Sequence, residues 1–143
     1  MRQMHKTIII PGQPVSKLRA RAGKNRHGHK ITYTPAKTKA KEETIGFYTL
    51  QEFKKPIPKG APVEVEVEFY FACPKSDFRK RTPRPLRPHL KTPDLDNLIK
   101  LVKDALNGIA WHDDAQVWKI GTARKFYCGQ ENNNPRTVIR VNW

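Results

Sequence analysis

The sequence predicts a small α/β (α+β) fold, built as one domain over residues 1–143 with a mixed β-sheet and two main helices. Three observations support this prediction. A chain of 143 residues is long enough for one hydrophobic core and too short for two ordinary domains. Residues 63–71 (VEVEVEFYF) alternate between apolar and polar side chains, which is typical of a half-buried strand. From Leu95 to Ile109, apolar residues recur at steps of three and four, which is typical of a helix with one buried face.

The first third of the chain contains a strand, a basic segment and a helix. Residues 5–10 are expected to form a short strand, because a Pro-Gly turn follows them. Residues 16–33 are basic and contain two glycines, which indicates an extended or mobile segment. Thr34 and Pro35 favour a helix start, with Thr34 as the N-cap and Pro35 as the first helical residue. That helix should end near Phe53, before a stretch that contains two prolines and a glycine.

The alternating strand over residues 63–71 carries three glutamates on its polar face, Glu64, Glu66 and Glu68. We expect these side chains to face water, because like charges along one strand face are usually solvated. A row of metal ligands is the alternative interpretation.

The second half of the chain contains a loop, a helix and two strands. Residues 74–93 contain five prolines and seven basic residues, which predicts a loop that stays mobile until it meets its ligand. The helix that follows should stop at Gly108. Residues 117–128 and 137–143 indicate two further strands. The predicted order is therefore strand, helix, strand, helix and two strands.

The chain is strongly basic, with 28 Lys and Arg against 13 Asp and Glu and a net charge of +15. Such an excess favours association with polyanions such as nucleic acids. The acids are clustered, because five of the six in residues 92–143 fall between Asp94 and Asp114. A carboxylate cluster repels phosphate unless it holds cations. A basic chain with one acidic region therefore indicates an enzyme that cleaves phosphodiesters rather than a passive binder.

Other classes of protein are disfavoured by the sequence. No stretch approaches the roughly 20 apolar residues of a membrane span, and the start of the chain lacks the apolar segment of a secretory signal. Cys73 and Cys128 are expected to be buried thiols, so we expect a cytoplasmic protein. A zinc site formed by His27, His29 and a cysteine is a less favoured alternative, because the spacing is poor.

Asp94 and Asp96 can serve one metal ion only if the chain is extended at Asp94. Side chains two residues apart point roughly 200° apart in a helix, whereas they share a side in an extended segment. We therefore expect the helix to begin at Asp96 or Asn97, with Asp96 placed where N-caps are favoured. Ordinary helix capping is the alternative role for these acids. Asp113 and Asp114 precede a strand. They could join the same metal site as Asp94 and Asp96, or they could simply form the turn between the helix and the strand.

Lys100 follows Asp96 by one helical turn. It could form an ordinary ion pair with Asp96, worth about 0.2–0.5 kcal/mol, or place its ammonium beside the scissile phosphate. Asp104 lies one turn further and is expected to pair with Lys100 rather than bind a metal.

Residues 94–100 (DLDNLIK), 104–108 (DALNG) and 113–116 (DDAQ) form a long, ordered series of motifs. In this series the chain resembles the RusA family of Holliday junction resolvases, which are crossover junction endodeoxyribonucleases. Residues 11–21 (PGQPVSKLRAR) and 33–35 (YTP) are also similar to phage and prophage members of that family.

The resemblance implies a homodimeric, Mg²⁺-dependent nuclease that resolves Holliday junctions by symmetric cuts in DNA recombination and repair, with Mn²⁺ able to replace Mg²⁺. By position in the motifs, Asp94, Asp96 and Asp114 would be the catalytic, metal-binding acids, with Asp113 as an additional candidate ligand. Lys100 would be the functional lysine. The resemblance also implies that the fold or the dimer brings Asp114 to the other two acids. The expected location is the cytoplasm of a bacterial or phage-infected cell.

Branched DNA is the expected partner, with no membrane and no small-molecule substrate. A two-fold dimer would supply the two sites that two matched cuts require. One alternative is a non-catalytic architectural protein, which needs basic patches but no organised acids. Another is a metal-dependent enzyme acting on nucleotides, for which a glycine-rich phosphate loop would be expected, and the sequence has none. The residues expected to contact DNA are Lys17, Arg19, Arg21, Lys24, Arg26, Arg79, Lys80, Arg81, Arg84 and Arg87.

Overall fold

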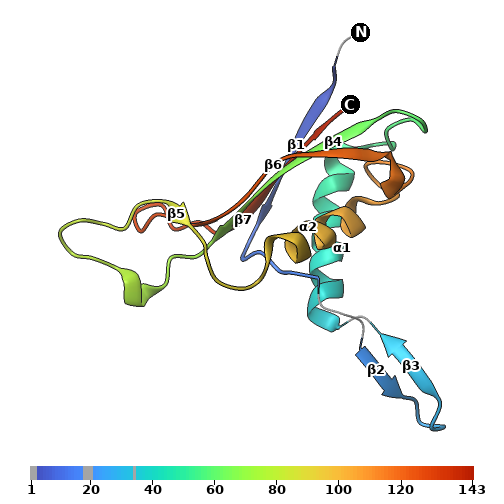
Figure 1. The fold of residues 1–143 in the computed structure, drawn as a ribbon, viewed down its shortest axis with the longest axis horizontal. Helices are drawn as coiled ribbons and strands as arrows, with labels where there is room; N and C mark the ends of the chain where they lie inside the picture. The colour runs from blue at the N-terminus through green and yellow to red at the C-terminus, as the bar shows by residue number, and fades with distance from the viewer. Residues whose placement is uncertain (1–2, 18–20, 34) are drawn as a thin grey trace.

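The computed structural model describes residues 3–17, 21–33 and 35–143, and its centre is a five-stranded sheet (Figure 1). The strands lie in the order β1-β7-β4-β6-β5. β4 pairs in parallel with β6, whereas the other neighbouring pairs are antiparallel, so the predicted mixed sheet is confirmed. The strands are β1 (His5–Pro11), β4 (Val63–Phe71), β5 (Arg87–Pro88), β6 (Val117–Tyr127) and β7 (Arg136–Asn142).

One face of this sheet carries the hydrophobic core. On β4, every second residue from Val63 to Phe71 is buried, and the residues between them are partly exposed. Ile10 of β1 and Ile139 of β7 belong to the same buried cluster. Because side chains alternate along a strand, these apolar residues all reach one face of the sheet.

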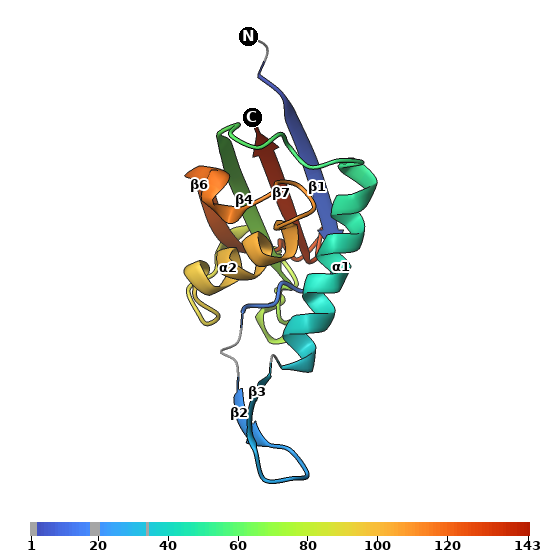
Figure 2. The ribbon, with the colours of Figure 1, turned by 90° about the vertical axis from the view of Figure 1, so that its right-hand side faces the viewer.

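Two helices, α1 (Ala36–Glu52) and α2 (Leu95–Leu106), cover that face (Figure 2). The helix α1 lies close to the end of α2 at Gly46, where an added Cβ would meet Cδ1 of Ile109 at 3.2 Å. Neither helix is long and apolar enough to cross a membrane. The residues that α2 buries are Leu98, Leu101, Val102, Ala105 and Leu106.

The predicted helix over residues 34–53 is confirmed, but its start is different. Pro35 precedes α1 in an extended conformation, with φ −54° and ψ 140°, so the helix begins at Ala36. The predicted N-cap, Thr34, lies outside the described residues. The order of the main strands and helices agrees with the prediction, and β4 has the predicted bounds.

Within the segment over residues 16–33, predicted to be extended or mobile, residues 21–33 form a hairpin of two extended strands. β2 (Arg21–Lys24) pairs antiparallel with β3 (Lys30–Tyr33). Gly28 adopts φ +77° in the connecting turn, and Oδ1 of Asn25 accepts hydrogen bonds at 3.0 Å from two backbone N–H groups of the turn. Both views show the hairpin projecting beyond the first turn of α1 (Figures 1 and 2).

The other face of the sheet carries ion pairs. The three glutamates of β4, predicted to face water, are partly exposed, and each pairs with a cation from a neighbouring strand. The pairs are Glu64–Lys119 (3.6 Å), Glu66–Arg140 (3.6 Å) and Glu68–Arg124 (2.7 Å). These partners give the glutamates a structural role, and the alternative of a metal row is not supported.

Candidate active site

Asp94 precedes the first turn of α2. Its backbone is extended, with φ −70° and ψ 148°, and its carboxylate makes no capping hydrogen bond. The extended conformation agrees with the prediction, but the cap does not. The helix begins at Leu95, which packs against the core, so Asp96 is the second helical residue rather than the N-cap. Both carboxylates are exposed near the positive end of the helix dipole.

Asp94 and Asp96 line one groove with a volume of about 980 Å³. Lys37, from the first turn of α1, lines the same groove, as do His89 and Tyr127. This volume exceeds the space that a metal ion needs. Its lining of carboxylates and ammonium groups can accommodate a phosphodiester strand together with cations.

A second hollow, of about 370 Å³, brings Asp96 together with Lys100 and Asp114. Asp96 therefore borders both hollows. The sequence left open whether the chain after α2 brings Asp114 back beside Asp96, near the start of α2. The chain reverses at Gly108, which adopts φ +82° and donates its N–H to the carbonyl of Trp111 at 2.8 Å.

Trp111 holds the carboxylate of Asp114, and Gln116 holds the turn in which Asp114 lies. The indole N–H of the fully buried Trp111 donates to Oδ1 of Asp114 at 2.8 Å. The side chain of Gln116 accepts from the backbone N–H groups of His112 and Asp113, and it donates to two carbonyls of the segment before β4. The signal for this role was the motif DDAQ, in which Gln116 follows the two acids.

The neighbouring acid, Asp113, has a different role. It is the N-cap of a short 3₁₀ helix, Asp114–Gln116, and its carboxylate accepts the N–H of Ala115 at 3.0 Å. Gln116 completes a reciprocal capping box with Asp113. The arrangement separates the two acids: Asp113 organises the turn, and Asp114 lines the hollow with Asp96.

The carboxylates are chemically suited to Mg²⁺, which prefers oxygen ligands and retains several waters. The described residues nevertheless contain no group of three or more His, Cys, Asp or Glu side chains placed to hold a metal ion. The fold brings Asp96 to Asp94 in one hollow and to Asp114 in the other, without closing the three into one shell. The zinc alternative with His27 and His29 likewise has no support.

One predicted ion pair near the site is formed by a different lysine. The predicted pair between Lys100 and Asp104 is replaced, because Asp104 pairs at 3.3 Å with Lys17. Lys17 also pairs with Glu42 of α1 and thereby connects the two helices. The hydrogen bond that Lys17 donates to the carboxylate of Glu42 is the main reason that the pKa of Lys17 is raised. Its charge is thus compensated within the chain, whereas Lys100 is exposed beside Asp96.

The basic residues predicted to contact DNA fall into two groups. Lys24 and Arg26 on the hairpin are exposed, and so are Arg79, Lys80 and Arg81 on the loop before β5. Lys17, Arg84 and Arg87 are instead partly buried and make contacts within the chain. Arg19 lies outside the described residues, as does the side chain of Arg21.

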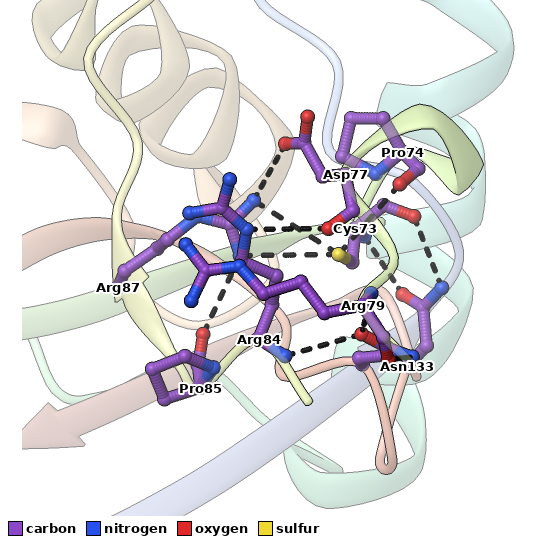
Figure 3. Close-up of polar contacts among 9 residues, drawn as sticks. Cys73, Pro74, Asp77, Arg79, Arg84, Pro85, Arg87 and Asn133 are labelled. Atoms are coloured by element: carbon purple, nitrogen blue, oxygen red, sulfur yellow. Dashed lines mark hydrogen bonds and ion pairs between the residues drawn. The ribbon is translucent and has the colours of Figure 1, made fainter. Parts of the chain in front are cut away.

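Polar contacts connect the loop over residues 74–93 to the body of the protein (Figure 3). The mobility expected for this loop stays a prediction. Arg87 donates to Asp77 at 2.8 Å, lies near the sulfur of the buried Cys73, and stacks over the ring of Tyr127. Arg84 donates to the carbonyl of Asp77 at 3.2 Å. These contacts use two arginines internally, which the charge pattern alone does not reveal.

Comparison with known proteins adds independent evidence. A family model described as endodeoxyribonuclease RusA matches residues 11–142. The chain belongs to the RusA family. Membership indicates an endodeoxyribonuclease that resolves Holliday junctions, and it agrees with the motifs between residues 94 and 116. A relative from Bacillus subtilis (strain 168), the uncharacterized protein YqaN, is 35% identical over 140 residues, which cover 94% of this chain and 93% of that protein.

Proposed function

We propose that this RusA-family chain is a divalent-metal-dependent endonuclease. As a homodimer, it would make a pair of symmetric cuts in each Holliday junction. The observation that carries the proposal is the position of Asp96. It shares one hollow with Asp94 and the other with Lys100 and Asp114. An exposed ammonium among carboxylates, in a strongly basic chain, is better suited to cleaving a phosphodiester than to binding DNA passively.

Asp94, Asp96 and Asp114 would hold the cation through their carboxylate oxygens. When bound, Mg²⁺ supplies a Lewis acid for the phosphate and a more acidic water. The chain itself orients these acids: α2 presents Asp96, and Trp111 holds Asp114 by its indole N–H. The ammonium of Lys100 would stabilise negative charge that develops on the phosphoryl oxygens.

The homodimer follows from the substrate. One chain presents one acidic region, and resolution requires two matched cuts, so a two-fold pair supplies two sites. Assembly on the junction would also allow the three carboxylates to close around a cation, since one chain leaves them in two adjoining hollows.

The decisive experiment is cleavage of a labelled four-way junction by Asp96→Asn, beside a matched linear duplex, in Mg²⁺, Mn²⁺ or EDTA. We expect the wild-type protein to make paired nicks in the junction only with metal. Asp96→Asn should lose at least about 100-fold in rate, because loss of a ligand should exceed the 10- to 100-fold cost of an outer-shell partner. Its junction affinity should be equal or higher, because negative charge near phosphate is removed.

Glu131→Gln is the matched control, because Glu131 is an exposed acid outside both hollows. Normal cleavage by Asp96→Asn would contradict the metal-site assignment. Tight junction binding by the wild-type protein without any cut in Mg²⁺ or Mn²⁺ would favour an architectural binder.

A further inference from the structure

Lys125 is a cation at a position of β6 where an apolar residue would be expected. It pairs in register with Phe69, which is buried on the core face, and its strand neighbours Ala123 and Tyr127 pack against the core. A lysine on such a face requires a partner for its ammonium. Arg124, the adjacent residue, faces the opposite side and pairs with a glutamate.

The partners of Lys125 are backbone carbonyls. Its Nζ donates to the carbonyl of Lys91 at 2.8 Å and to that of Pro93 at 2.9 Å. The backbone carbonyl of Lys125 also accepts the N–H of His89 at 3.0 Å. Three alternate residues of one segment are therefore connected to a single residue of the sheet, and the last of them directly precedes Asp94.

This attachment determines where the first acids lie. Asp94 makes no capping hydrogen bond that would position it, and Asp96 follows within the first helical turn. The entry into α2 is held instead from its N-terminal side, by charge-assisted bonds from the ammonium. The rings of Phe71 and Tyr127 pack on His89, with centroids at 4.1 and 4.5 Å, and support the same segment.

We propose that Lys125 is a positioning residue for the reaction centre: its ammonium fixes the Lys91–Pro93 turn on β6 and so sets Asp94 and Asp96 relative to the sheet. The inference rests on the proposed role of these acids. It assigns to Lys125 a contact with the protein backbone rather than with DNA phosphate, although Lys125 belongs to a strongly basic chain.

The test compares Lys125→Met, Lys125→Arg and the control Lys119→Met in the full-length protein. Lys119 lies on the same strand but is half-exposed and pairs with Glu64 on the opposite face. Single-turnover cleavage of a four-way junction is measured with Mg²⁺ at saturating protein. Junction affinity is measured in EDTA over a range of salt.

We expect Lys125→Met to cleave about 10- to 100-fold more slowly, because a displacement of about 1 Å at a reaction centre can cost this much. Its junction affinity and the salt dependence of that affinity should stay at the wild-type level, since no phosphate contact is lost. Lys125→Arg should recover part of the rate, because a guanidinium can donate to both carbonyls. Amide hydrogen exchange should accelerate over residues 89–97 in Lys125→Met and remain unchanged in Lys119→Met.

A salt dependence weaker by one phosphate contact, with an unchanged rate at saturation, would overturn the proposal and assign Lys125 to DNA binding. If Lys125→Met does not fold, Lys125→Cys alkylated to an aminoethyl side chain provides the second variant, and failure of the amine to restore cleavage would also overturn it. Asp96→Asn separates the two hypotheses. If Asp96→Asn is inactive and Lys125→Met is normal, only the positioning role fails, whereas an active Asp96→Asn contradicts the proposed acid site itself.

Discussion

At the scale of single residues, His89 joins the loop, the sheet and the groove. The residue is 5% exposed, its ring stacks on Phe71, and its Nδ1 has no hydrogen-bond partner among the described residues. Burial, followed by the nearby ammonium of Lys125, lowers the pKa of His89 below its ordinary value of 6.5. The folded protein therefore keeps this imidazole neutral at pH values where the unfolded chain already binds a proton.

This imidazole predicts acid sensitivity of the fold. Between pH 6.5 and the lower folded pKa, the unfolded state binds more protons at His89, so the free energy of unfolding decreases as the pH falls through this window. Well above pH 6.5 the group is neutral in both states and contributes no pH dependence. His89→Phe should lose less stability than the wild-type protein between pH 7.5 and pH 5, as measured by urea unfolding. The exposed His112, changed to Gln, is the control, and an identical slope for His89→Phe and the wild type would contradict the argument.

At the scale of elements, the basic loop before β5 is closed by one side chain from the β6–β7 connection. Oε1 of Gln130 accepts from the backbone N–H groups of Arg79 (2.8 Å) and Arg84 (3.1 Å), and its Nε2 donates to the carbonyl of Arg79 (2.9 Å). The backbone N–H of Gln130 donates to the carbonyl of Arg84 at 2.8 Å. Lys80 and Arg81 are therefore presented on a loop with fixed ends, which reduces the entropy lost when DNA binds.

Gln130→Ala should release that loop without removing a positive charge. We expect stability to fall by about 1 kcal/mol, because partly exposed hydrogen bonds contribute little each. Junction affinity should fall several-fold while the slope of log affinity against log salt stays unchanged, because the phosphate contacts remain. Limited proteolysis should cut more rapidly within residues 79–84. An unchanged affinity together with faster proteolysis would show that the loop does not contact DNA.

At the scale of the whole molecule, two basic projections leave the body at separate places. Figure 1 shows the β2–β3 hairpin and the loop over residues 74–86 pointing in different directions, with the segment that enters α2 between them. The exposed cations of both projections are free to meet phosphates, whereas the acids of α2 lie in the central grooves. This arrangement fits a branched DNA whose arms diverge from the point of cleavage.

The two projections should contribute independently to salt-dependent binding. Each phosphate contact contributes about −0.9 to the slope of log affinity against log salt. The double variants Lys24→Ala with Arg26→Ala, and Lys80→Ala with Arg81→Ala, should each weaken the slope by roughly 2, and the effects should add. Lys54→Ala with Lys55→Ala, beyond the other end of α1 from the hairpin, should leave the slope unchanged. Equal slopes for all variants would contradict the arrangement.

Much of this protein can be predicted from its sequence, because the relevant information is local. Alternation over residues 63–71 predicts β4, and the spacing of apolar residues after Leu95 predicts α2 and its buried face. The charge pattern predicts an enzyme that cleaves phosphodiesters. The motifs around Asp94 and Asp96 resemble those of the RusA family, and the family is confirmed.

Contacts between distant parts of the chain were decided only by the tertiary structure. The tertiary structure forms the β2–β3 hairpin, closes the basic loop through Gln130, and places Arg84 and Arg87 in internal contacts. These features depend on partners remote in sequence or on turn geometry, and a charge pattern contains neither. The return of Asp114 to the side of α2 likewise depends on where Trp111 is buried. Periodicity records which side of an element faces the core, whereas the position of one carboxylate relative to another depends on how the entire core packs.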